Sequence, residues 1–533
     1  MAACHVIPGM TLTSPGILTR ARDAAKPAID GRSRRELLPR ATRLAAALAG
    51  LAAIGAYLFV ALSRLDYQFA LEPLEGNSLV EVHRILAGQP LYPAPTAGYV
   101  PDGYPPLYFL VSAAVARVLG AGYLSLRLVS LVSSLACFAL LARLVQRETG
   151  SIAAGTGAAG VFAATYFTAG TWFDIGRVDS LFLALSLGGL YAARHMRGAR
   201  GAIAAGLLLA AAALTKQTAL AEAAAVTAAL LTGPRRRLAC VAALTEVTVL
   251  GVSTVVLRFS SGGWYTYYAF KQMSEHPLTY ANFGWFWTAL LAAAGLAAGA
   301  ALIGARRVPR ELLAGCAALA VEGYATLVHS GGAVNDMLPA YLAAALLAGL
   351  ALGGPARWVA TACGVLVLAQ SVFLLASAHP SQVIPTSADR AAGERLIAGM
   401  RAFDGDVAVP DNPSLSLLAG MAPAAVPGAA YDVVRATDRA GIASYRNSAY
   451  QAVKTRRFSA IITWGPGKPL YGPRNLVQDY QECLQPLPVS PATLLVPAPD
   501  SHRPRPAVVW IPWGSGSCQD AISVLDGGKA AGA

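Results

Sequence analysis

The chain has 533 residues, of which 55% are hydrophobic and only 13% are charged. Soluble domains carry about 25% charged residues, so this composition excludes an ordinary soluble enzyme. The net charge of +13 lies mostly in short arginine-bearing loops between apolar blocks. Such a distribution indicates membrane topology and argues against a nucleic-acid partner.

The first 42 residues are polar and rich in proline, serine and arginine. They predict a disordered basic arm (1–42) on the cytoplasmic side. The first apolar block begins only near Leu44, whereas a signal peptide has its apolar core directly after a basic start. This block is therefore interpreted as the first transmembrane helix.

The following apolar blocks predict a polytopic α-helical membrane domain over residues 43–377, with about eleven transmembrane helices. They lie near 44–63, 124–144, 152–171, 179–194, 202–216, 218–232, 238–258, 284–304, 311–328, 337–353 and 357–377. With the N-terminus in the cytoplasm, each cytoplasmic loop is short and basic, as the positive-inside rule requires. The C-terminal tail then lies outside, which predicts a multi-pass protein of the inner (cytoplasmic) membrane.

The segment 105–120 (PPLYFLVSAAVARVLG) decides this topology, because counting it as a span would place the later arginines outside. Pro105 and Pro106 suit the start of a helix, and Arg117 suits the polar face of a helix at the membrane surface. We therefore expect one long external loop, 64–122, that holds two interfacial helices at 76–87 and 105–120.

The tail, 378–533, has nearly balanced charge and no apolar span, and it predicts an extracytoplasmic α/β domain. Strands are expected at 406–410 and 458–464, and helices at 387–403 and 435–457. Its two cysteines, Cys483 and Cys518, form an even pair that predicts one disulfide in an oxidising compartment. The alternative is a pair of free thiols.

Common catalytic motifs are missing from the sequence: HExxH, CxxC, the Walker A loop and GxSxG do not occur. A single GxGxxG, at 155–160, lies inside an apolar block with no strand before it. Small residues that allow close helix packing explain it better than a dinucleotide site. We therefore expect no cofactor and no metal cluster, although two neighbouring carboxylates leave room for a divalent ion.

Ionisable and aromatic residues gather in the predicted external loops, where charges at a membrane edge usually have a partner or a function. They are Glu72, Glu75, Glu81, Asp102, Tyr104, Asp174, Arg177, Asp179, Lys216, Gln217, Trp264, Tyr265, Tyr267, Tyr268, Lys271, Glu275, His276, His329, Asn335 and Asp336. Cations can hold a phosphate, aromatic rings can stack on a sugar, and a carboxylate can deprotonate a hydroxyl. The expected ligand is a lipid phosphate that carries a sugar.

Several motifs, in this order, resemble one family: Glu75-Gly76, GQPLY at 88–92, YVPDGYPPLY at 99–108, RVDSL at 177–181 and LTKQT at 214–218. The chain looks like a bacterial GT-C superfamily glycosyltransferase of the protein-O-mannosyltransferase and aminoarabinose-transferase type. The resemblance covers roughly residues 44–377 and implies a GT-C-like fold with two interfacial helices in the first external loop.

The resemblance also implies roles for individual residues. Glu75 is expected as the catalytic base with Glu72 as its rival, and Asp174 and Asp179 would shape the acceptor side. Arg177 and Lys216 would hold the donor phosphate, while Tyr104, Tyr268, His329 and Asn335 would contact substrate. The chain departs from the family at EPLEG, where Asp-Glu neighbours are common, and at Asp102-Gly103-Tyr104, where aminoarabinose transferases carry a lysine.

Structural explanations remain open for most of these residues. Glu75 and Asp179 could cap helices, Arg177 could pair with Asp174, and Lys216 could extend from a short helix to the membrane surface. The tyrosines at 265–268 could belong to an interfacial aromatic belt, which we favour.

The sequence thus predicts a glycosyltransferase that moves a sugar from a polyprenyl-phosphate donor to an acceptor hydroxyl, with inversion at the anomeric carbon. The acceptor, whether glycan, lipid or protein, is not specified. The alternative is a transporter or flippase of a lipid-linked substrate, which would carry ionisable groups at mid-span and broken helices in matching halves. Because most charges gather at one face, the enzyme is favoured.

Overall fold

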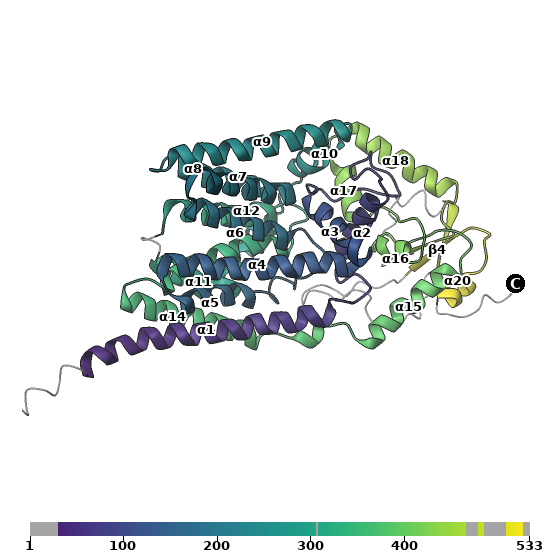
Figure 1. Cartoon of the computed structure of the whole chain (residues 1–533). Coiled ribbons are helices and arrows are strands. Elements are labelled where there is room, and N and C mark those ends of the chain that lie inside the picture. The colour runs from purple at the N-terminus through teal and green to yellow at the C-terminus, as the bar shows by residue number, and fades with distance from the viewer. Residues whose placement is uncertain (1–29, 305–307, 465–477, 484–507, 526–533) are drawn as a thin grey trace, which may run out of the picture.

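In the computed structural model, residues 30–304, 308–464, 478–483 and 508–525 are described. Long helices lie side by side in a bundle, and the strands of the C-terminal region gather beyond one end of it (Figure 1). We call this end, marked by Arg64, Tyr123 and Asp179, the site end, and the other the opposite end.

Each of the eleven expected spans corresponds to one helix of the bundle. These helices are α1 (Asp30–Arg64), α4 (Tyr123–Thr149), α5 (Ile152–Ala164), α6 (Asp179–His195), α7 (Gly198–Thr215), α8 (Leu220–Leu231), α9 (Arg236–Ser260), α11 (Tyr280–Gly304), α12 (Arg310–Leu327), α13 (Leu338–Leu352) and α14 (Arg357–Ala376). Short helices connect them: η1 (Gln217–Ala219), α10 (Trp264–Thr266), the π-helix η2 (Tyr267–Gln272), η4 (Val334–Met337) and η5 (Pro380–Gln382).

Within the described residues, seven helices are long and apolar enough to cross a membrane, which makes this a multi-pass helical protein. They are Leu37–Arg64, Tyr123–Thr149, Gly198–Thr215, Arg236–Ser260, Tyr280–Gly304, Val334–Leu352 and Arg357–Ala376. Shorter apolar helices cover Leu107–Leu119, Ile152–Ala164 and Gln217–Leu231. A full span needs about 20 residues, so the expected count of eleven stays a prediction.

Helix α1 begins at Asp30 rather than near Leu44. The part of the expected disordered arm at 30–42 is therefore helical, since its leucines, arginines and alanines are strong helix formers. The rest of that arm, 1–29, lies outside the described residues.

The GxGxxG segment 155–160 packs helices together, as the sequence indicates. A Cβ on Gly160 would collide with the backbone of Gly50 on α1, and one on Gly155 would collide with the carbonyl oxygen of Ala142 on α4. Glycines let these helix backbones approach closely.

Two helices lie in the first connection, close to where they are expected: α2 (Pro73–Leu86) and α3 (Leu107–Leu119). Glu72 caps α2, because its carboxylate accepts a hydrogen bond from the backbone N–H of Glu75 at 3.0 Å. Pro73 occupies the first helical position, where its missing N–H costs nothing. The location of α2 and α3 at a membrane surface stays a prediction.

The C-terminal region combines helices with a small mixed sheet in the order β1-β2-β4-β3. Its elements are α15 (Ser387–Arg401), β1 (Val407–Ala408), α16 (Pro413–Leu418), α17 (Pro427–Arg435), α18 (Arg439–Lys454), β2 (Ala460–Thr463), β3 (Tyr480–Cys483), β4 (Val508–Pro512) and α20 (Cys518–Leu525). Strands β1 and β2 are parallel, and β4 is antiparallel to both β2 and β3. A disulfide joins Cys483 and Cys518, the pairing expected from the sequence.

This C-terminal region lies against the first connection. Helix α16 approaches α2 so closely that a Cβ on Gly76 would come within 2.6 Å of Asn412 Oδ1. The Tyr123 hydroxyl donates to Ser414 Oγ at 2.5 Å, and the backbone N–H of Ala97 donates to Ser448 Oγ at 3.0 Å. The fold therefore encloses α2 between the bundle and the C-terminal region.

Candidate active site

Glu75 is buried and held by four hydrogen-bond donors. The Arg127 side chain on α4 donates to both of its carboxylate oxygens, at 2.8 and 2.9 Å. The backbone N–H groups of Leu71 and Gly176 each donate to it at 2.7 Å. A carboxylate that is occupied in this way fixes the loop around it and has little capacity left to accept a proton from a substrate.

Asp174 is held in a second pair of the same kind. The Arg64 guanidinium at the end of α1 donates to both of its oxygens at 2.7 Å, and the Tyr166 hydroxyl donates to it at 2.8 Å. Asp174 therefore pairs with Arg64 rather than with Arg177. This pair anchors the connection between α5 and α6 to the bundle.

Sequence reasoning missed Arg64 and Arg127, the partners of these two acids. Both side chains are fully buried. The one available signal is an arginine inside an apolar helix, as in LSLRLVS around Arg127, which is costly unless a partner compensates it.

A separate cluster surrounds the half-buried Tyr104, between α2 and the ends of α6 and α7. Arg177 donates to Asp102 Oδ2 at 3.0 Å and to the Tyr104 hydroxyl at 3.3 Å. Its guanidinium carbon also lies 5.5 Å from the centre of the Trp172 ring. The buried Nε of Arg177 has no hydrogen-bond acceptor among the described residues.

Lys216 approaches the same tyrosine from the end of α7. Its Nζ donates to Asp179 at 3.0 Å and to Asp336 at 3.4 Å, and Asn335 donates to the same Asp179 oxygen at 3.3 Å. Burial raises the pKa of Tyr104 to about 12, although Arg177 and Lys216 both act to lower it. Arg177, between α5 and α6, and Lys216, between α7 and α8, thus both act to lower the pKa of the same phenol.

Lys216 and Asp179 are connected to the first loop. The side chain of Gln217, next to Lys216, donates to the backbone oxygen of Gly103 at 2.8 Å. The second oxygen of Asp179, Oδ2, is buried and has no donor among the described residues. Buried polar atoms without partners are uncommon, so this atom and Arg177 Nε are available to bind a polar group of a substrate.

Glu72 is the carboxylate of the first loop that differs most from Glu75. It is half-buried, and its carboxylate accepts hydrogen bonds from the backbone N–H groups of Leu74 and Glu75 at the start of α2. Burial raises the pKa of Glu72 to about 7, while the nearby Arg177 acts to lower it. A carboxyl group with this pKa can exchange protons near neutral pH.

Helix α2 adds two polar side chains to the cluster, Asn77 and Glu81, which are four residues apart and so share a helix face. Asn77 donates to Asp102 Oδ1 at 2.7 Å, and Glu81 accepts from the backbone N–H of Asp102 at 2.7 Å. Burial raises the pKa of both Glu81 and Asp102. Sequence reasoning did not assign Asn77, Glu81 or Asp102, although their positions one helical turn apart and before the Tyr-Pro-Pro motif were visible.

Two of the expected substrate contacts lie apart from this cluster. Tyr268 is buried, donates to the backbone oxygen of Pro93 at 3.0 Å and packs beside Trp264 and Tyr267. His329 is half-buried and pairs with the backbone oxygen of Ala325 four residues earlier. The six expected site residues that the structure brings together are Glu72, Tyr104, Arg177, Asp179, Lys216 and Asn335.

A cavity of about 300 Å³ lies next to the cluster, and Val334 and Met337, which flank Asn335 and Asp336, line it. Most of its other walls are apolar and come from α11, α13, α14 and the connection after α5: Phe167, Thr168, Trp285, Ala289, Ala292, Ala293, Tyr341, Leu374, Ser377, His379, Gln382 and Val383.

Over the part of the chain that the structure describes, His, Cys, Asp and Glu side chains form no group of three that could hold a metal ion.

Solved structures of two proteins are similar to this chain. The crystal structure of ArnT from Cupriavidus metallidurans in the apo state matches 77% of this chain and 92% of its own, at 13% identity and a TM-score of 0.55. The same protein bound to undecaprenyl phosphate matches 80% and 83%, at 15% identity and a TM-score of 0.47. The archaeal oligosaccharyltransferase AglB from Archaeoglobus fulgidus matches 77% and 69%, at 11% identity and a TM-score of 0.46.

The first of these structures establishes the fold, which is the GT-C-like fold expected from the sequence. No protein of curated function matches the chain in sequence. Residues 103–264, which contain Tyr104, Arg177, Asp179 and Lys216, match the family described as dolichyl-phosphate-mannose-protein mannosyltransferase. The segment that carries most of the cluster is thus similar to the protein mannosyltransferases, and the chain as a whole has a GT-C-like fold.

Proposed function

We propose that the protein transfers a sugar from a polyprenyl-phosphate donor to an acceptor hydroxyl at the outer face of the inner membrane. The observation that carries this proposal is the position of Arg177 and Lys216, which come from separate connections and flank Tyr104 beside the capping carboxylate Glu72. The match of residues 103–264 to the mannosyltransferase family supports the same chemistry.

The two cations are suited to bind the donor phosphate. Charge-assisted hydrogen bonds from Arg and Lys to phosphate are strong, and Arg177 keeps a buried Nε without an acceptor among the described residues. Lys216 is already balanced by Asp179 and Asp336, so it can shift between these acids and a phosphate oxygen.

The cavity beside Asn335 suits the first part of the lipid chain. Its volume is about 300 Å³, and rings and aliphatic side chains such as Phe167, Trp285 and Leu374 line it. Because Val334 and Met337 belong both to this wall and to the segment that carries Asn335 and Asp336, a phosphate at Lys216 would have its chain at the cavity.

Glu72, rather than Glu75, is our choice for the base. Glu75 is saturated by Arg127 and two backbone N–H groups, whereas Glu72 accepts from two backbone N–H groups and has a pKa of about 7. The ideal base has a pKa near the working pH, where it is partly deprotonated and still basic. Asp179, with its unpartnered Oδ2, is the alternative.

The reaction is a single displacement. Glu72 takes the proton of the acceptor hydroxyl, the acceptor oxygen forms a bond to the anomeric carbon, and the bond between that carbon and the phosphate oxygen breaks. The electron pair leaves with polyprenyl phosphate, whose growing charge Arg177 and Lys216 stabilise. Attack from the face opposite the phosphate inverts the anomeric carbon.

Donor binding and turnover, measured separately, test this assignment. We would measure binding of radiolabelled polyprenyl-phosphate sugar to the purified protein, and sugar transfer in membranes that hold the native acceptors. Glu72→Gln should bind donor as the wild type does but lose about 10²- to 10⁴-fold in turnover, whereas Arg177→Gln should weaken binding. Asp66→Asn, an exposed acid in the same loop, is the matched control and should change neither.

Two results would contradict the proposal. Failure of the wild type to bind any polyprenyl phosphate would remove the donor class. Full turnover in Glu72→Gln would remove the base, and Asp179→Asn would then be the next variant to compare. A transporter would instead move the labelled lipid across the membrane with its sugar still attached, which the transfer assay separates from catalysis.

A further inference from the structure

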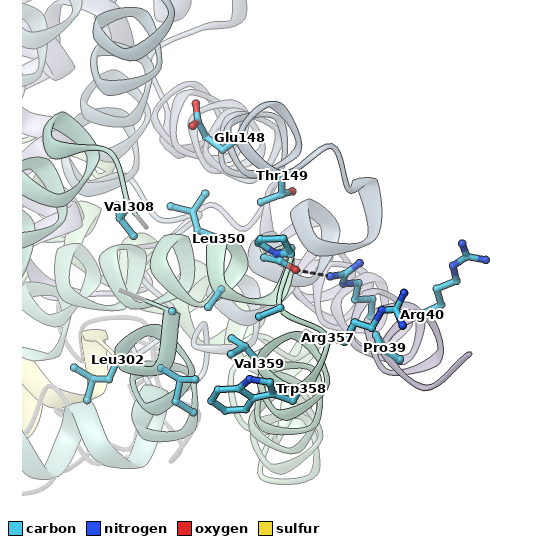
Figure 2. A pocket seen from close by; sticks show the side chains of 18 of the residues that line it. Pro39, Arg40, Glu148, Thr149, Leu302, Val308, Leu350, Arg357, Trp358 and Val359 are labelled. Carbon is cyan, nitrogen blue, oxygen red and sulfur yellow. Dashed lines mark hydrogen bonds between the residues drawn. The ribbon is translucent and has the colours of Figure 1, made fainter. Parts of the chain in front are cut away.

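Figure 2 shows a second and larger cavity. Its lining residues place it at the opposite end of the bundle from the cluster around Tyr104. Its volume is about 1130 Å³, and it lies between the ends of α1, α4, α11, α13 and α14. The proposed transfer reaction has no use for it, because every residue that we assign to the reaction lies at the site end.

The polar part of this cavity is basic. Arg40 and Arg43 of α1 and Arg357 of α14 line it, together with the first turn of α14. The N–H groups of a first turn have no partner within the helix and favour an anion. Among the described lining residues, Glu148 is the one acid, and Arg194 already holds both of its oxygens at 2.8 and 2.9 Å.

Arg43 contributes to the shape of the cavity as well as its charge. It donates to the backbone oxygens of Leu352 and Gly354, at 2.8 and 2.9 Å, at the C-terminal end of α13, where a cation is favourable. Arg43 thus ties α1 to α13 and fixes one wall, whereas Arg40 and Arg357 have exposed side chains at its edge.

The remaining walls are apolar and open toward the surroundings of the bundle. Trp358 is 71% exposed and Leu302 is 78% exposed, and both line the cavity (Figure 2). Tryptophan is enriched at the level of lipid headgroups. A site with arginines at its polar part and exposed aliphatic and aromatic side chains beside them matches an amphipathic anion.

We propose that this cavity binds the phosphodiester headgroup of an acidic phospholipid, with the acyl chains against Trp358 and Leu302. Basic pockets between membrane helices hold such headgroups by charge, while the chains stay in the bilayer. The bound lipid would bridge α1 and α14, which pack against each other along the bundle.

The test uses the purified full chain and measures the affinity of phosphatidylglycerol by native mass spectrometry. Arg40→Gln/Arg357→Gln should bind it about 30-fold more weakly, since each basic residue near a lipid surface contributes about a factor of five. Arg236→Gln/Arg237→Gln, two exposed arginines at the same end, lose equal charge and should bind as the wild type does. Arg40→Lys/Arg357→Lys keeps the charge and should keep most of the affinity.

Two further arms identify the ligand. Phosphatidylcholine, which has no net charge, should bind at least tenfold more weakly than phosphatidylglycerol, and excess inorganic phosphate should not displace the lipid. Phosphatidylglycerol with brominated chains should quench less fluorescence in Trp358→Phe than in the wild type. Equal affinity of the Gln double variant and the wild type, equal binding of phosphatidylcholine, or displacement by phosphate would each overturn the proposal.

Discussion

At the scale of single residues, the molecule uses its acids in two different ways. Glu75 and Asp174 each accept two hydrogen bonds from one buried arginine. Glu72 and Asp179 keep oxygens with few or no partners. We infer that the first pair holds the backbone around the candidate site, and we propose the second pair for the reaction.

Glu75→Gln should therefore lower the stability of the folded protein. Removing one partner of a buried ion pair leaves the other charge uncompensated, which costs about 3–5 kcal/mol. We expect a clear fall in the midpoint of thermal inactivation of the detergent-purified protein. Glu394→Gln replaces an exposed acid and should shift it little. A Glu75→Gln protein as stable as the wild type, with donor binding kept and turnover lost, would identify Glu75 as the base instead.

The pKa of Glu72 gives a prediction for pH. Burial raises this pKa from 4.5 to about 7, and the base works only when it is deprotonated. The kcat/KM of transfer should rise about tenfold per unit below pH 7 and level off above it. Glu72→Asp keeps a carboxylate and should keep a rising acid limb at a lower rate. A flat profile between pH 5 and 8 in the wild type would contradict the assignment.

The same shift affects stability with the opposite sign. A carboxyl whose pKa is higher in the folded state binds its proton more tightly there, so its contribution to stability is present at low pH. It is lost as the pH rises from about 4.5 to about 7. Activity and stability should thus change in opposite directions across this range, which separates the effect of Glu72 from a general acid denaturation.

At the scale of elements, close contact between α2 and α16 holds the C-terminal region near the site. Gly76→Ala would push a methyl group to within 2.6 Å of Asn412 Oδ1, and such overpacking costs about 1–3 kcal/mol. We expect faster limited proteolysis of the C-terminal region and a lower unfolding midpoint. Gly428→Ala, in α17 with nothing within 4 Å of the added Cβ, is the control and should be neutral or slightly stabilising. Equal proteolysis of both variants would mean that α2 and α16 do not depend on each other.

Apolar blocks were sufficient to locate every expected helix of the bundle, because a helix that crosses a membrane needs a long run of apolar residues. The apolar pattern did not predict segments whose backbone conformation depends on particular polar contacts. The block at 152–171 predicted one long helix, but α5 ends at Ala164. The chain then runs irregularly through Thr171, which has a positive φ, and Arg64 binds both the hydroxyl and the backbone oxygen of that residue.

The site itself was only partly predictable. Sequence order placed Arg177, Lys216 and Tyr104 in loops of one face, and the structure brings them together. Which acid pairs with which arginine depends on where α1 and α4 lie relative to the loops. No local sequence pattern contains that information. Asp174 and Arg177 are three residues apart, yet they bind different partners.

At the scale of the whole molecule, the basic connections and the disulfide both bear on the orientation of the protein in the membrane. The arginine-rich connections lie at the opposite end, where Glu148, Arg194, Glu311 and Arg235 form a network of ion pairs. The disulfide lies in the C-terminal region beyond the site end. Disulfides persist in oxidising compartments, and basic loops stay in the cytoplasm, so both predict that the site end faces outside.

Reporter fusions truncated after residues 122, 200 and 400 test this orientation, and should read outside, inside and outside. The second fusion ends in the first turn of α7, and the third ends in α15. A membrane-impermeant thiol reagent should label Cys483 and Cys518 in intact spheroplasts only after reduction. Labelling without reduction would mean that the two cysteines are free thiols outside. A cytoplasmic reading at residue 400, or no labelling of the tail even after reduction, would mean that the site faces the cytoplasm. The donor would then have to present its sugar on the inner leaflet, and the acceptor would have to be cytoplasmic.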